Sequence, residues 1–155
     1  MAARSKARKR ALDVLFESDL RNTDPMVTLE AWQRRNDPPV QPHADRLVRL
    51  VAEHSAEVDA AVAGRLVGWD YARLAPVDRA LLRLATAELL WVDDVPDAVV
   101  IDEAVELAKS LSTDDAAGFV NGVLARIAAD KPALRAGPAP DGATAAAEPT
   151  SSSRT

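Results

Sequence analysis

Residues 95–129 contain two successive stretches in which apolar residues recur at intervals of three and four. This spacing places them on one side of an α-helix. Between the stretches stand Ser112, Thr113 and Asp114, whose side-chain oxygens accept hydrogen bonds from free N–H groups at a helix start. The pattern predicts two amphipathic helices joined by a polar turn, which must bury their apolar faces against further helices. The first face comprises Ile101, Ala104, Val105, Ala108 and Leu111, and the second Ala116, Phe119, Val120, Val123, Leu124 and Ile127.

The residues before this pair predict further helices by the same spacing. Helices are expected from Ala7, after the Asp24-Pro25 cap, over residues 44–67 and from Pro76. A rigid proline-rich loop is expected at 36–42, and a hinge at 68–75 with Trp69 and Tyr71 as its anchors. Trp32 falls at core spacing, and Gly122 predicts the close approach of a neighbouring helix. The predicted fold is all-α: two small three-helix bundles packed together, spanning residues 6–70 and 71–130, after a basic N-terminal arm at residues 1–10.

The end of the chain has a different composition. Residues 131–155 are rich in Pro, Gly, Ala, Ser and Thr and show no periodicity. Such a segment cannot bury enough apolar surface to fold, so a disordered and dispensable tail is expected. The chain has 155 residues and no cysteine, which excludes disulfides and thiolate sites. No apolar run approaches the length of a membrane span, and a bacterial cytoplasm is expected.

The charge is unevenly distributed. The net charge is −5, yet residues 1–10 hold five cations and no acid, whereas residues 11–130 hold 11 Lys or Arg against 22 Asp or Glu. Cations at a helix start oppose the helix dipole, so helix stability does not explain them. A solvated arm is one interpretation, and binding to nucleic-acid phosphates is the favoured one. The cations are Arg4, Lys6, Arg8, Lys9 and Arg10.

Nothing in the sequence predicts catalysis. The acid pairs Asp93-Asp94, Asp102-Glu103 and Asp114-Asp115 are adjacent on helices, where neighbouring side chains diverge by about 100°. The two histidines, His43 and His54, have no partners at metal-ligand spacing and are interpreted as structural. There is no phosphate-binding glycine loop and no nucleophile–base set. We therefore expect no enzyme, no cofactor and no metal.

Four segments resemble the NusB family of bacterial transcription antitermination factors. They are KARKRALDVLFESDL near the N-terminus, PVDRALLRLATAELLWVDDVP in the middle, and EAVELAKSLSTDD followed by FVNGVL. Their order matches that of the family, and together they cover most of residues 6–129. The resemblance implies an all-helical protein of two three-helix bundles that binds single-stranded boxA RNA of ribosomal RNA operons. The implied partners are NusE, a small-subunit ribosomal protein, and the transcription elongation complex; a homodimer is possible.

The resemblance also implies where the partners bind. The RNA face would comprise Arg4, Lys6, Arg8 and the turn at Asp115 and Phe119, with Lys9 and Arg10 as additional cations. Many relatives have a basic residue just before the phenylalanine, where this chain has Gly118. Phe119 itself has the spacing of a core residue, and stacking on a base is the alternative. The NusE contact would fall on Asp78, Arg79, Leu82 and Arg83.

Two alternatives to an RNA-binding antitermination factor remain. One is a helical adaptor that binds only protein. The other is a domain related to the helical RNA-binding domain of rRNA cytosine methyltransferases, although those enzymes use catalytic cysteines and this chain has none.

Overall fold

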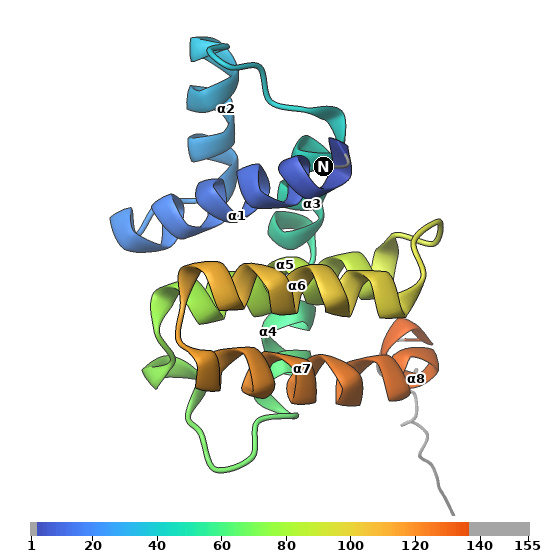
Figure 1. The fold of residues 1–155 in the computed structure, drawn as a ribbon. Helices are drawn as coiled ribbons and strands as arrows, with labels where there is room; N and C mark the ends of the chain where they lie inside the picture. The colour runs from blue at the N-terminus through green and yellow to red at the C-terminus, as the bar shows by residue number, and fades with distance from the viewer. Residues whose placement is uncertain (1–2, 137–155) are drawn as a thin grey trace, which may run out of the picture.

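The structure is a computed structural model that describes residues 3–136, and the described part is entirely helical. The fold-class prediction is thus confirmed. Figure 1 shows one layer with the first three helices and a second layer with the rest. The helices are α1 (Ala3–Arg21), α2 (Pro25–Arg35), α3 (Pro42–Glu53), α4 (Ser55–Ala63), α5 (Pro76–Trp91), α6 (Asp97–Leu111), α7 (Asp114–Ala129) and α8 (Lys131–Ala136), with a 3₁₀ turn η1 (Tyr71–Arg73) before α5.

The helix starts follow from capping residues. Asp24 accepts a hydrogen bond from the backbone N–H of Met26 at 2.7 Å and precedes Pro25, the first residue of α2. Thr113 likewise accepts from the backbone N–H of Ala116 at 3.1 Å and starts α7. The polar turn predicted between the two C-terminal helices is therefore a capped helix start, and the helical hairpin is confirmed.

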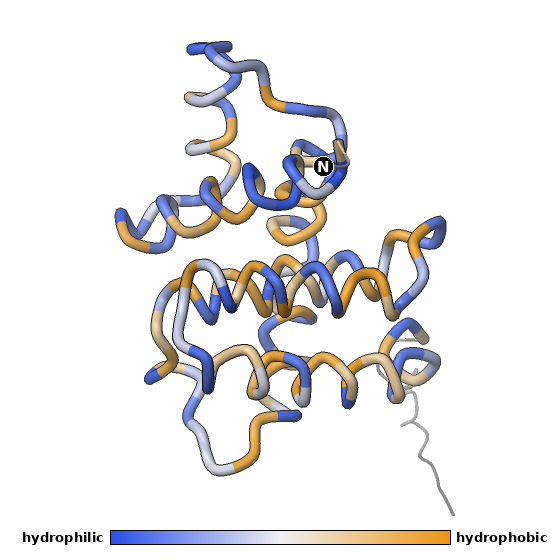
Figure 2. Tube along the Cα trace, viewed as in Figure 1, coloured by the Kyte–Doolittle hydropathy of each residue, from blue (hydrophilic) through white to orange (hydrophobic). Residues whose placement is uncertain are grey.

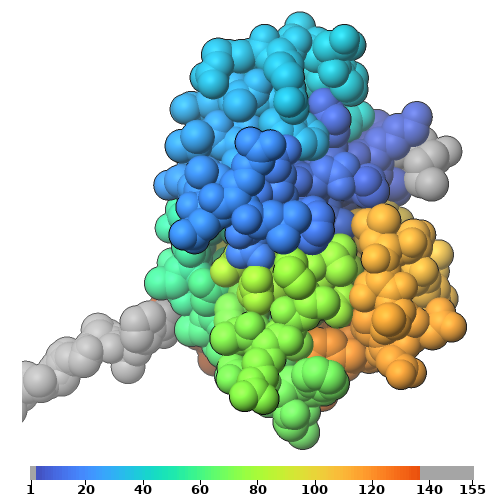
Figure 3. Space-filling view, turned by 90° about the vertical axis from the view of Figure 1, so that its left-hand side faces the viewer, coloured from blue at the N-terminus to red at the C-terminus, as the bar shows by residue number. Residues whose placement is uncertain are grey.

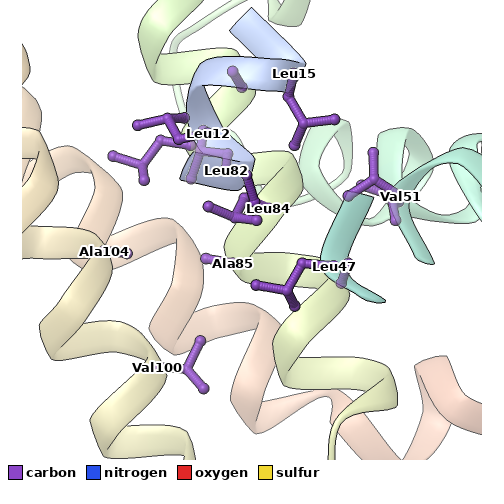
Figure 4. Packing of buried hydrophobic residues seen from close by; sticks show 14 of the residues in the cluster. Leu12, Leu15, Leu47, Val51, Leu82, Leu84, Ala85, Val100 and Ala104 are labelled. Carbon is purple, nitrogen blue, oxygen red and sulfur yellow. The ribbon is translucent and has the colours of Figure 1, made fainter. Parts of the chain in front are cut away.

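Helix α5 lies at the centre of the protein and packs against α1, α3, α4, α6, α7 and α8. Every residue from Leu84 to Leu90 is buried, as expected for a helix that is covered on all sides. Figure 4 shows Leu82, Leu84 and Ala85 of α5 among side chains from α1, α3 and α6. Along the other helices, hydrophobic and hydrophilic residues alternate (Figure 2). Of the helices in the described part of the chain, none is long and apolar enough to cross a membrane.

The core also contains an ionic cluster. The Arg8 guanidinium of α1 donates to both oxygens of Glu88 of α5, with Nη2–Oε2 at 2.7 Å and Nε–Oε1 at 2.8 Å, and to Glu103 of α6 at 3.1 Å. His43 of α3 contacts Glu88 Oε2 at 3.1 Å. Burial by itself raises the pKa of Glu88, but the hydrogen bonds from His43 and Arg8 outweigh it and hold this pKa below its ordinary value. The cluster joins four helices.

The long helix predicted over residues 44–67 is wrong, because the chain breaks at His54. This residue has φ −111° and ψ 28°, outside the helical region. Its ring stacks on Trp91 of α5 with centroids 3.9 Å apart, and its Nδ1 lies 3.0 Å from Glu57. The break lets α3 pack on α1 and α2, and α4 on α5 and α7. Helix α4 therefore packs with α5 and α7, which belong to the second predicted bundle (residues 71–130). In the sequence, however, α4 falls within the first predicted bundle (residues 6–70).

The tail predicted from residue 131 is wrong in its first six residues, which form α8. Lys131 Nζ lies 2.7 Å from Asp97, Arg135 lies 2.8 Å from Asp93, and Leu134 packs on the core. The sequence does not predict this short helix, because its single partly buried leucine produces no periodic pattern. The rest of the predicted tail, residues 137–155, lies outside the described residues.

Gly122 does not mark a close neighbouring helix. The atoms nearest to a Cβ placed there belong to the guanidinium of Arg126, one turn later in α7, at 3.6 Å. That guanidinium lies over the glycine and donates to the backbone oxygen of Arg65 at 3.1 Å. The expectation of a helix–helix approach at this residue is therefore wrong.

Replacing Glu88 with Gln should lower the free energy of unfolding by about 3 kcal/mol at pH 7, since the buried Arg8 cation loses its bidentate carboxylate and retains only the half-exposed Glu103. The folded-state pKa of Glu88 is depressed, so its contribution is complete above the unfolded value of about 4.3 and is lost as the pH falls through the folded value. Denaturant unfolding at pH 7 and pH 3 should show the gap between wild type and variant shrinking. A gap of equal size at both pH values would contradict this, and Glu106→Gln, at an exposed pair, is the control.

Truncation after Asp130 should lower the free energy of unfolding by about 1 kcal/mol, because it removes the contact of Leu134 with the core. The melting temperature should fall by roughly 3 °C. Truncation after Ala136 retains α8 and is the matched control. Thermal denaturation followed by circular dichroism gives the melting temperature of each truncated protein. Equal melting temperatures for the two would show that α8 does not stabilise the fold.

Candidate nucleic-acid interface

The outward-facing cations of α1 are fewer than the sequence suggests. Lys6 is exposed. The side chain of Arg4 is 42% exposed and pairs with Asp94 at 3.0 Å, and that of Lys9 is 44% exposed and pairs with Asp13 of its own helix at 2.9 Å. The bond from Arg4 holds the pKa of the Asp94 carboxyl below its usual value. Exposed pairs of this kind contribute little to stability, so Arg4 and Lys9 can exchange their acids for phosphates.

Arg8 does not belong to that surface. It is only 5% exposed and is engaged by Glu88 and Glu103. Both carboxylates raise its pKa despite the opposing effect of burial. The prediction that Arg8 contacts RNA is therefore corrected: on α1, position 8 faces α5, and the cation is a core residue.

Arg10 holds a loop in place. Its Nη2 donates to the backbone oxygen of Pro38 at 2.9 Å, and its guanidinium lies 4.4 Å from the centroid of the Trp32 ring. Trp32 is 9% exposed, which confirms its predicted place in the core, and its indole N–H donates to Glu17 at 3.2 Å. Arg10 thus connects α1 to the proline-rich loop, and any contact with RNA would compete with this role.

The predicted turn at the start of α7 lies at a hollow in the surface. Asp115 is exposed, and Phe119 is half-buried, with its ring centroid 5.6 Å from that of Trp69. Phe119 packs on the core and also lines the hollow, so its two interpretations are compatible. The groove has a volume of about 210 Å³. It is lined by Trp69, Leu74, Ala75, Asp78, Thr113, Asp115, Ala116 and Phe119.

Trp69 was missing from the predicted site. It was expected, with Tyr71, to anchor the hinge, but it is 60% exposed. Tyr71 does anchor that segment: its hydroxyl donates to Asp59 at 2.7 Å, and Arg83 Nε lies 2.8 Å from the same hydroxyl. Burial, together with the bond to Asp59, raises the pKa of Tyr71. An aromatic residue directly after a glycine, in a segment without helical spacing, is the available signal.

The four residues predicted to contact the partner protein do not form one surface. Leu82 is fully buried at 0% exposure, so its prediction as a contact is wrong. Arg79 pairs with Asp19 at 2.6 Å, and Arg83 with Asp59 at 3.0 Å. Asp78 lines the groove beside Phe119. Burial of Leu82 follows from the position of α5, which is covered on every side.

A second groove lies on the other side of the first turn of α5. Its volume is about 360 Å³ and its lining is mostly apolar. Figure 3 looks onto this face, where α1, the start of α5 and the turn between α6 and α7 meet, with the segment before η1 below them. Phe16 packs partly on the core, and Leu111 is 40% exposed. The lining residues are Leu12, Asp13, Phe16, Pro76, Val77 and Leu111.

The described residues offer no group of three His, Asp or Glu that could hold a metal ion. The described part of the chain has a two-layer helical fold, a few exposed cations and, on either side of the first turn of α5, a surface groove. These features define an all-α protein whose candidate binding groups lie on its surface.

The chain belongs to the NusB family, whose sequence model matches residues 5–129. The Transcription antitermination protein NusB of Acidothermus cellulolyticus is 55% identical over 140 residues, which cover 90% of this chain and 97% of that protein. The Streptomyces avermitilis protein of the same name is 49% identical, covering 87% and 97%. These relatives are named for a role in transcription and not for a catalysed reaction.

Solved structures agree with this assignment. The T. maritima NusB structure superposes with a TM-score of 0.75 at 37% identity, covering 83% of this chain and 92% of that one. A structure of the antitermination factors NusB and NusE in complex with dsRNA contains a chain with a TM-score of 0.72 at 30% identity, covering 81% and 96%. The resemblance inferred from the sequence motifs is thereby confirmed.

Proposed function

We propose that this protein is a transcription antitermination factor that binds boxA-type RNA of ribosomal RNA operons together with NusE, and that it acts in the cytoplasm on the elongation complex. The observation that carries the proposal is its membership of the NusB family over residues 5–129. A structural neighbour that combines NusB, NusE and RNA supports both partners. A helical adaptor that binds only protein should not bind RNA. A direct measurement of RNA binding therefore distinguishes the antitermination factor from such an adaptor.

The RNA surface that we propose joins the outer side of α1 to the start of α7. Lys6, Arg4 and Lys9 supply the charge for phosphates, and Asp115 and Phe119 contribute at the other end. Gly118 precedes Phe119 on the exposed side of α7, and a Cβ placed there meets nothing within 4 Å. The surface therefore carries fewer cations than the sequence alone suggested, and one open position where a cation fits.

The double variant Arg4→Ala/Lys6→Ala should bind a short single-stranded boxA RNA more weakly. Each phosphate contact on a single strand contributes about 0.7 to the slope of log affinity against log salt, so the slope should flatten by up to about 1.4. Gly118→Lys should steepen it by up to about 0.7. Filter binding at several salt concentrations measures both changes. The control is Arg21→Ala/Arg34→Ala, which removes two exposed cations elsewhere; an equal effect of that control would show that only net charge matters.

The NusE surface that we propose is the apolar groove between α1 and the start of α5. Interfaces of this kind are centred on apolar side chains that lose their water on binding. Phe16, Val77 and Leu111 supply that apolar area, and Asp13 at the edge suits a basic partner such as a ribosomal protein. Arg79 pairs with Asp19 and Arg83 with Asp59. In this proposal the two arginines position the start of α5 and do not contact NusE.

Leu111→Asp should abolish co-elution with NusE in size-exclusion chromatography, because it places a charge on the apolar lining of the groove. Leu111 is already 40% exposed, so the fold should survive. Val99→Asp alters a residue of the same helix that is 42% exposed and lies outside the groove. It should leave NusE binding intact. If Asp78→Lys abolishes co-elution and Leu111→Asp does not, the partner binds on the other side of α5.

A further inference from the structure

Two guanidinium groups converge on one indole where α1 and α2 meet. The guanidinium of Arg10 in α1 lies 4.4 Å from the centroid of the Trp32 ring, and that of Arg35, the last residue of α2, lies 5.3 Å from it. The two cations are separated by no more than the sum of these distances, which is close to the Debye length of about 10 Å at 0.1 M salt. They therefore repel one another, although the ring attracts each of them.

Among the described residues, no acid forms an ion pair with either of these two cations. The first two acids of α1 are engaged elsewhere: Asp13 pairs with Lys9, whereas Glu17 accepts from the indole N–H and pairs with Arg21. Asp37, in the loop after α2, is exposed and contacts neither guanidinium. The positive charge at this place is therefore left without a counterion from the protein.

Structural roles explain Arg10 but not Arg35. Arg10 donates to the backbone oxygen of Pro38 and holds the loop, and its Nε is buried without an acceptor. Arg35 is exposed and, within the described part of the chain, makes no hydrogen bond or ion pair. A cation in the last turn of α2 suits the helix dipole, but Arg34 already supplies one there. The Arg35 guanidinium is therefore available to a ligand.

Lys6 connects this pair of cations to the RNA surface of α1. It is exposed and stands four residues before Arg10, so the two lie on the same side of the helix, about 6 Å apart along its axis. Together, Lys6, Arg10 and Arg35 form the α1–α2 basic patch. In Figure 1, α2 stands on the side of α1 that is opposite to α6 and α7. The patch therefore leads away from the start of α7.

We propose that the α1–α2 basic patch binds phosphates of the RNA segment that flanks boxA, with Arg35 as the contact on α2. This inference rests on the proposed RNA-binding function and extends the path of the RNA to a helix that the sequence did not implicate. Trp32 is only 9% exposed and is covered by two guanidinium groups, so the patch offers charge and no ring for a base. Arg10 keeps its bond to Pro38 and contributes its charge without touching the strand. Phosphate contacts of this kind are independent of base sequence.

The test compares a short boxA RNA with the same RNA extended by a run of uridines at its 5′ or its 3′ end. With the wild type, one of the two extensions should steepen the slope of log affinity against log salt by about 0.7 for each phosphate that is contacted, which corresponds to about 5-fold tighter binding at 0.1 M salt. Arg35→Ala should remove the gain from one such contact and leave the affinity for the unextended RNA unchanged. Filter binding at several salt concentrations measures both quantities.

Two further variants separate a contact from a general effect of charge. Arg34→Ala is the matched control, because it removes the neighbouring exposed cation from the same helix end but not one that lies over Trp32. It should retain the gain from the extension. Arg35→Lys keeps a cation at the position and should retain most of that gain. Circular dichroism verifies that each variant is folded.

Other outcomes would overturn the inference. If the unextended RNA binds and neither extension tightens binding, RNA binding stands and the patch does not take the flanking segment. An equal loss with Arg34→Ala and Arg35→Ala would show that only net charge acts. If Arg35→Ala weakens binding of the unextended RNA by the same factor, the patch belongs to the boxA site itself. If it weakens only NusE binding, the patch takes an acidic segment of the protein partner. If the wild type binds none of these RNAs with or without NusE, the proposed function itself is wrong.

Discussion

The bidentate pair between Arg8 and Glu88 sets the arrangement of the two layers. Glu88 lies on the central helix α5 and is 1% exposed, so its charge requires donors from the helices around it. Arg8 and His43 supply them from α1 and α3. Because a guanidinium offers donors in a fixed planar fork, this contact specifies how α1 crosses α5 as well as joining them. The surface cations of α1 are held at a defined angle by a cation that is itself buried.

Much of the fold could be predicted from the sequence because its helices are amphipathic and capped. The spacing of apolar residues identified the C-terminal pair, and the capping oxygens of Asp24 and Thr113 identified two helix starts. The break at His54 left no such trace, since the apolar spacing continues across it, and the residue on which His54 stacks, Trp91, is far away in sequence. Helix α8 could not be predicted because it has no repeated apolar spacing. It packs through one leucine and two ion pairs.

The candidate site was less predictable than the fold, because charge and exposure are different properties. The five cations of residues 4–10 look alike in a sequence, yet the helix turns them in different directions: position 8 faces α5, and position 10 faces Trp32. On α5, Asp78 and Leu82 lie one turn apart on the same face, yet Asp78 lines a groove at the first turn whereas Leu82 is fully buried further along the helix. Trp69 was overlooked because a loop has no periodicity from which exposure can be inferred.

The first turn of α5 separates two grooves of different character. On one side, Pro76 and Val77 border an apolar hollow shared with α1; on the other, Ala75 and Asp78 border a hollow with two aromatic rings. The turn between α6 and α7 closes both, through Leu111 and Thr113 respectively. A protein in the first groove and an RNA strand in the second would therefore be neighbours without sharing side chains. Such an arrangement allows each ligand to stabilise the same helix corner and so to favour the other, since binding that orders a shared element lowers the cost of the second event.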